Sequence, residues 1–85
     1  MIPAADAWGP FAPGLPEAER RAQLRALRAL SKVYAGPRAA ALCQLLAQAE
    51  TDTAALEPAS RALHHLEPLD WRRILSSFAN LSASA

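Results

Sequence analysis

The chain contains very few β-branched residues, and this scarcity restricts its fold more than any other feature. Among 85 residues the β-branched ones are Ile2, Val33, Thr51, Thr53 and Ile74. Sheets draw heavily on such residues, whereas alanine and leucine, which favour helices, occupy 21 and 13 positions here. The length fits one domain. The sequence therefore predicts an all-α fold, a compact bundle of three to four short helices.

Residues 1–15 are predicted to form a proline- and glycine-rich arm in front of this bundle. Proline recurs at every third position from Pro10 to Pro16, which is the period of a polyproline II helix. Trp8 and Phe11 lie in this arm, although disordered tails contain few aromatic residues. Two interpretations stay open: the two rings cover the chain's own helices, or they anchor the arm to a partner protein.

Residues 16–81 are predicted to form the helical domain. Pro16 suits a first helical turn, and the Gly36-Pro37 pair is a strong stop signal, so the first helix should end near Ala35. The prolines divide the rest into three further helices, expected at residues 37–49, 58–67 and, from Pro68 or Asp70, to 81. Residues 82–85 are expected to fray.

Charge, cysteine content and hydropathy argue against several classes of protein. The formal net charge of +1 is far below the excess typical of a dedicated nucleic-acid binder. A single cysteine cannot form an internal disulfide, and no apolar run approaches the length of a membrane span. No signal-peptide pattern is visible. The sequence predicts a cytoplasmic protein without a membrane segment.

Residues able to carry chemistry do not form a recognisable motif. The three glycines lack the spacing of a phosphate-binding loop. His64 and His65 are adjacent, and on a helix they point about 100° apart, too far to share a metal ion comfortably. A nucleophilic pair of Cys43 with either histidine would make the chain an enzyme, which is the third-ranked hypothesis. We expect no catalysis, no cofactor and no metal site.

The first predicted helix carries a row of basic residues, and this row is the main candidate site. Its members, at positions i, i+4, i+7 and i+11 of one helix face, are Arg21, Arg25, Arg28 and Lys32. Residues 1–39 have a net charge of +3 and residues 40–85 a net charge of −2. Three interpretations compete: a solvated face opposite the leucine stripe, a surface for an acidic protein, or a surface for nucleic acid.

The start of the last predicted helix combines an aromatic residue with two arginines, Trp71, Arg72 and Arg73. Aromatic residues and arginine are favoured at protein interfaces. The hypothesis is a small non-catalytic protein–protein interaction module, namely an adaptor, an accessory subunit or an inhibitor-like regulator. Its expected partner is a larger protein with an acidic surface, and self-association is a further option. The expected contacts are the basic row together with Trp8, Phe11, Trp71 and Arg72. The alternative is a small nucleic-acid-binding regulator that uses the basic row.

Overall fold

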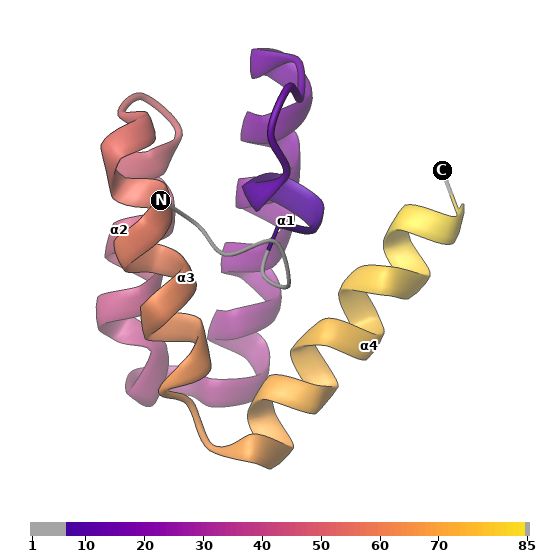
Figure 1. Ribbon diagram of the computed structural model, residues 1–85. Coiled ribbons are helices and arrows are strands. Elements are labelled where there is room, and N and C mark those ends of the chain that lie inside the picture. Colours follow the sequence, from indigo (N-terminus) through magenta and orange to yellow (C-terminus); the bar gives the residue numbers. More distant parts are fainter. Residues whose placement is uncertain (1–6, 85) are drawn as a thin grey trace.

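The structure is a computed structural model that describes residues 7–84, with side chains described for residues 7–81. Within that part the chain is all-α, as the sequence predicts, and contains no strand. Figure 1 shows the bundle, whose helices are α1 (Glu17–Ala35), α2 (Ala40–Ala49), α3 (Leu56–His64) and α4 (Pro68–Ser84). The described residues also form the 3₁₀ turns η2 (Gly9–Phe11), η3 (Gly36–Ala39) and η4 (Thr53–Ala55).

The turn between α1 and α2 lies where the sequence predicts it, but it is longer. Gly36 adopts a positive φ of 56°, a conformation that suits glycine, and its N–H bonds back to the carbonyl of Lys32. Pro37 then occupies the start of the 3₁₀ turn η3, so the α-helix expected from Pro37 begins only at Ala40. This tight reversal folds α2 back along α1.

The third helix begins two residues earlier than predicted. Asp52 caps the turn η4, because its Oδ1 accepts a hydrogen bond from the N–H of Ala54 at 3.0 Å. α3 then starts at Leu56, which places Pro58 in its first turn. Proline costs little there, because the first N–H groups of a helix have no partner within the helix.

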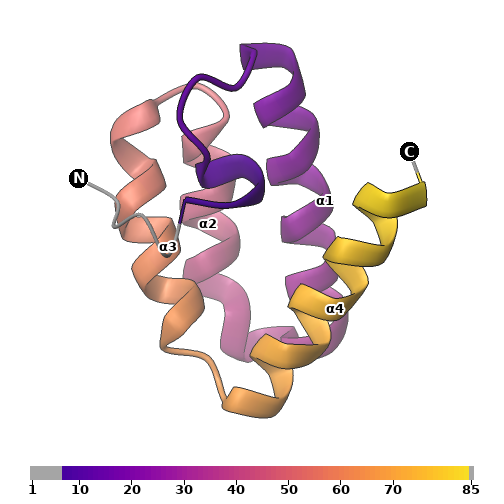
Figure 2. The ribbon, with the colours of Figure 1, turned by 45° about the vertical axis from the view of Figure 1, so that its right-hand side comes forward.

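The last helix starts at Pro68 and continues through Ser84, beyond Leu81 where the sequence predicts fraying; Ala85 lies outside the described residues. α4 packs chiefly against α1 and diverges from α2 and α3 toward its C-terminal end (Figures 1 and 2). The hydroxyl groups of Tyr34 and Ser77 join the two helices with a hydrogen bond of 2.8 Å.

The centre of the core consists mainly of leucines from three helices and one isoleucine from α4. The most fully buried of these side chains are Leu24, Leu27, Leu42, Leu46, Leu63 and Ile74. Their burial removes apolar surface from water and supplies the main stabilisation of the bundle. The leucine stripe of α1 thus faces inward, which turns the opposite side of that helix toward solvent.

The described part of the arm belongs to the same domain. Phe11 is buried in the core, and Trp8 packs edge-on against both Phe11 and Phe78. Arg20 fixes the arm from α1, because its Nε donates to the carbonyl of Pro10 at 3.1 Å and its Nη2 to that of Ala12 at 2.6 Å. Residues 1–6 of the predicted arm lie outside the described part.

Candidate functional site

Two arginines of the basic row bind an acid from the neighbouring helix. The Nε of Arg25 lies 2.7 Å from Oε1 of Glu50, and Nη1 of Arg28 lies 3.6 Å from Oε2 of the same carboxylate. Glu50 follows directly after α2, and the reversal at Gly36 brings that end of α2 to the middle of α1. A carboxylate that lies 25 residues after Arg25 in the sequence is therefore ion-paired within the basic row.

The exposures of the three side chains differ in a way that matters for binding. The side chain of Glu50 is only 12% exposed, whereas Arg25 and Arg28 are 66% and 41% exposed. The carboxylate is thus largely enclosed, while both guanidinium groups keep part of their surface open. A second carboxylate can therefore reach both guanidinium groups from solvent, whereas Glu50 depends on them more strongly than an exposed carboxylate would.

A shallow, open groove of about 890 Å³ runs between α1 and α2 beside these ion pairs. Basic side chains of α1 form its rim, and small or apolar residues form most of its floor. The lining residues are Arg25, Arg28, Ala29, Lys32, Gly36, Pro37, Ala40, Cys43, Gln44 and Ala47. The groove therefore combines an apolar surface with a row of positive charges on one side.

The helix α2, which forms one wall of the groove, carries no charged residue. Its exposed positions are Ala40, Ala41, Gln44 and Gln48. A helix at the surface of a monomer normally has charged or polar residues on its solvent side. In α2 this side is uncharged and consists of two alanines and two glutamines.

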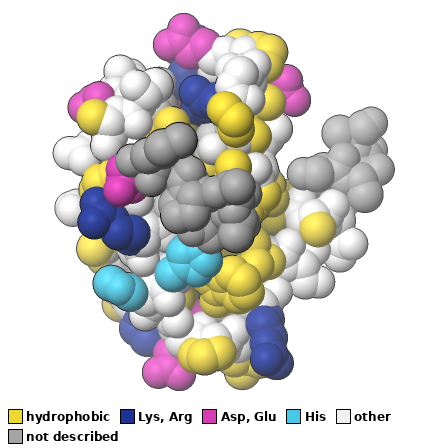
Figure 3. Space-filling model, viewed as in Figure 1, with side chains coloured by type: hydrophobic (Ala, Val, Ile, Leu, Met, Phe, Trp, Pro, Cys, Tyr) yellow, Lys and Arg dark blue, Asp and Glu magenta, His cyan; other side chains and the backbone are white. Residues whose placement is uncertain are grey.

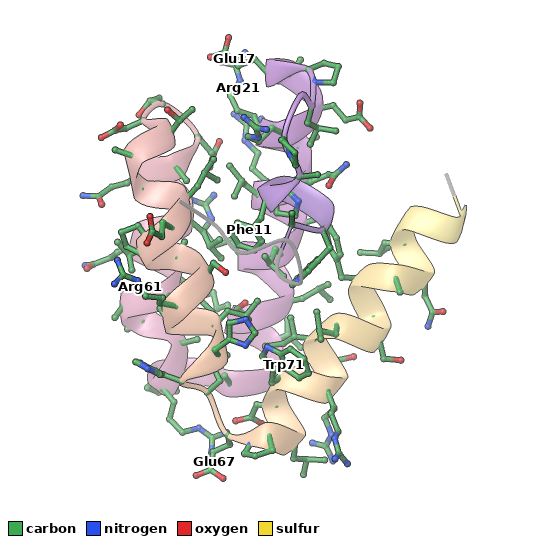
Figure 4. All side chains as sticks on the ribbon, in the orientation of Figure 1. Phe11, Glu17, Arg21, Arg61, Glu67 and Trp71 are labelled. Atoms are coloured by element: carbon green, nitrogen blue, oxygen red, sulfur yellow. The ribbon has the colours of Figure 1, made fainter. Side chains whose placement is uncertain are left out.

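The remaining members of the basic row occupy different surroundings. Lys32 is exposed on the groove rim, and no ion pair found among the described residues includes it. Arg21 lies at the other end of α1 near Glu17 (Figure 4) and lines a separate depression of about 210 Å³. The structure thus brings Arg25, Arg28 and Lys32 together on one groove and places Arg21 apart from it.

The single cysteine lies on the floor of the groove, half-buried. Its thiol points to the carbonyl oxygen of Arg28 at 3.8 Å, a weak hydrogen bond. Burial raises the pKa of the Cys43 thiol, and the positive charges of Arg28 and Lys32 lower it by less. A thiol with a raised pKa forms less thiolate at neutral pH and is a poor nucleophile.

The aromatic residues expected to anchor a partner are engaged within the molecule. Phe11 is 4% exposed and belongs to the chain's own core, so of the two interpretations of the arm the structure supports the one in which this ring packs on the chain's own helices. Trp8 covers it from outside. Trp71 points from α4 toward α3 (Figure 4), where its ring lies 5.6 Å from that of His64. Arg72 is exposed and does not line the groove.

The face of the molecule on the side of α3 and the arm differs from the groove in the distribution of its charged side chains. Figure 3 shows apolar side chains there between the bundle and α4, with the visible Lys and Arg side chains scattered around them. No continuous basic surface appears on the described part of that face. The basic side chains visible on this face are therefore dispersed and form no row.

The described residues contain neither a candidate metal site nor a helix that could span a membrane. No group of three His, Cys, Asp or Glu side chains there could hold a metal ion. Over the same range, no helix combines the length and the apolar character needed to cross a bilayer.

Sequence reasoning missed Glu50 as a member of the site and missed the groove itself. It treated the basic row as uninterrupted because no acid lies within that stretch of α1. The sequence does contain one signal for the groove, because the ten-residue segment of α2 has no charged residue. No family model matches this sequence, and no curated protein or solved structure is significantly similar to it.

Proposed function

We propose that this chain is a small non-catalytic interaction module whose groove between α1 and α2 binds an acidic segment of a larger protein. The observation that carries the proposal is the pairing of an uncharged helix face with a basic rim on one groove. Apolar surface supplies the contact area and the three cations select for acidic partners. An adaptor, an accessory subunit or an inhibitor-like regulator would use such a surface.

The same features weigh against nucleic acid as the main partner. A phosphate backbone needs a broad positive surface, and here Glu50 places a negative charge within the basic row. The apolar wall of α2 would gain little from contact with phosphates. Catalysis finds no support either, because the raised pKa of the Cys43 thiol disfavours its nucleophilic form.

Two single charge-reversal variants test this proposal, one at the groove and one away from it. Lys32→Glu changes a cation on the groove rim, and Arg72→Glu makes a comparable change at an exposed position of α4 that does not line the groove. The tagged variants and the native chain would be used to capture proteins from the source cells, with and without nuclease, and the captured proteins would be quantified by mass spectrometry.

We expect a protein partner that survives nuclease, is captured about fivefold or more weakly by Lys32→Glu, and is unaffected by Arg72→Glu. Equal capture by both variants and the native chain would contradict the groove as the interface. Loss with Arg72→Glu alone would assign the interface to α4. Capture that depends on nucleic acid would instead support a nucleic-acid-binding regulator.

A further inference from the structure

The dimensions of the groove indicate the shape of what it binds. Its lining follows α1 from Arg25 to Lys32 and continues to Gly36 at the start of η3, which corresponds to a length of about 16 Å at the helical rise. This is about three turns of a partner helix. Helices pack with their axes 8–10 Å apart when they meet, and the closest distances require small side chains at the contact.

The residues on the floor meet that requirement. Ala29 comes from α1, and Ala40, Cys43 and Ala47 come from successive turns of α2. Because α1 and α2 present short side chains along the groove, a third helix can lie in it and contact both. Nothing in the floor offers the row of free N–H and C=O groups that an extended strand would need, because both walls are helices.

The positive charges on the rim indicate that the molecule bound in the groove is negatively charged. Arg25, Arg28 and Lys32 stand at i, i+3 and i+7 of α1 and so lie along the same side of the groove. A helix lying beside them can offer carboxylates at the same spacing. Glu50 already places one carboxylate between Arg25 and Arg28, with one oxygen directed to each.

We propose that the groove accepts a three-turn amphipathic helix with a row of acidic residues, and that Glu50 is an internal competitor for two of the cations that this helix uses. The inference rests on the proposed function and specifies its partner. In the free chain the single negative charge of Glu50 neutralises part of the positive charge of Arg25 and Arg28. On binding, an incoming carboxylate shares or takes over these contacts, while Lys32 forms a new ion pair.

The probe is a synthetic acidic peptide of about 15 residues, with Glu at every third or fourth position and Ala and Leu on the adjoining face. A second peptide carries Gln at each Glu position and serves as its neutral control. Binding is measured by fluorescence anisotropy of the labelled peptide. Alkylation of Cys43 is measured in parallel, because a helix seated on the floor covers this thiol.

Two variants of the chain test the role of Glu50. Glu50→Gln removes the carboxylate between the arginines, and Glu67→Gln removes the same charge from an exposed position that does not line the groove (Figure 4). Both variants alter the net charge equally, so their long-range effects match. Circular dichroism and urea unfolding confirm that each variant keeps the fold.

We expect the acidic peptide to bind Glu50→Gln about two- to fivefold more tightly than the native chain, because the competing negative charge beside two partly exposed arginines is lost. Glu67→Gln should bind like the native chain. The peptide should slow Cys43 alkylation, and the neutral peptide should not. Equal affinity of Glu50→Gln and Glu67→Gln would overturn the competitor role of Glu50.

The outcomes separate this inference from the proposed function. If the acidic peptide neither binds nor protects Cys43, while Lys32→Glu still loses the captured protein, the helical occupant is wrong and the groove remains the interface. If Lys32→Glu retains that protein, the proposed function fails and the inference fails with it.

Discussion

The indole ring of Trp8 meets the phenyl ring of Phe78 edge-on, with ring centroids 5.8 Å apart. This contact joins the arm to the last helix, the two ends of the described chain. Trp8 also packs against Phe11, which reaches the core. The three rings close the side of the bundle on which α4 packs chiefly against α1.

The arm should therefore contribute substantially to stability. Replacing buried Phe11 with Ala removes most of a core side chain, and we expect it to lower the free energy of unfolding by about 3–5 kcal/mol. Phe11→Leu keeps most of the volume and should cost less than about 1.5 kcal/mol. Urea unfolding followed by circular dichroism measures both. A stable Phe11→Ala variant would mean that the arm is not docked in solution.

Gly9 should be more sensitive to substitution than Gly36. Both have a positive φ, so alanine is strained at each, but a Cβ at Gly9 would also lie 2.7 Å from Cε1 of Phe78, whereas Gly36 has open space. We expect Gly36→Ala to cost about 1–2 kcal/mol and Gly9→Ala more than that. Equal unfolding free energies for the two variants would show that the Phe78 ring moves aside freely.

The ion pair between Arg38 and Asp70 predicts an asymmetry between its two partners. Oδ2 of Asp70 lies 2.9 Å from Nη2 of Arg38, in a geometry that is too poorly aligned for a good hydrogen bond. Asp70 is 7% exposed and Arg38 is 61% exposed. Removing the cation leaves a buried carboxylate alone, whereas removing the carboxylate leaves an arginine that water can solvate.

We therefore expect Arg38→Met to destabilise the chain by about 1–3 kcal/mol and Asp70→Asn to destabilise it by less. Thermal unfolding of the two variants and of the double variant gives the coupling between the residues. A larger loss for Asp70→Asn would indicate that Asp70 stabilises α4 by some contact other than Arg38.

The local features of the fold could be predicted from the sequence because they depend on neighbouring residues. Gly36-Pro37 ends α1 where expected, since the conformations of glycine and proline decide that turn. The prediction places Pro58 at the start of the third helix, and the observed start differs by only two residues, because the whole first turn of a helix tolerates proline.

The site could be predicted only in part. The spacing of Arg25, Arg28 and Lys32 placed them on one face, and the structure keeps them there. Their pairing with Glu50 depends on how α2 folds back on α1, a distance relation that helical periodicity does not contain. For the same reason the sequence could not decide whether Phe11 enters the core or remains exposed.

The thiol of Cys43 should titrate above the usual range. Because burial raises its pKa, the folded chain holds the proton more tightly than the unfolded chain does. Its contribution to stability is therefore present at neutral pH and declines as the pH rises through the ordinary thiol range. When the alkylation rate is measured against pH, the inflection should lie at a higher pH for the folded chain than for the chain unfolded in urea. Lys32→Gln should raise the inflection further, and an inflection at or below that in urea would contradict this assignment.

If a partner covers the groove between α1 and α2, as we propose, Cys43 on the groove floor reports on it directly. The measurement is the rate of Cys43 alkylation at one pH in the free chain and in its purified complex with the captured protein. We predict that the complex reacts about tenfold or more slowly, because the half-exposed thiol on the groove floor becomes covered. An unchanged rate in an intact complex would contradict the claim and would locate the interface elsewhere on the chain.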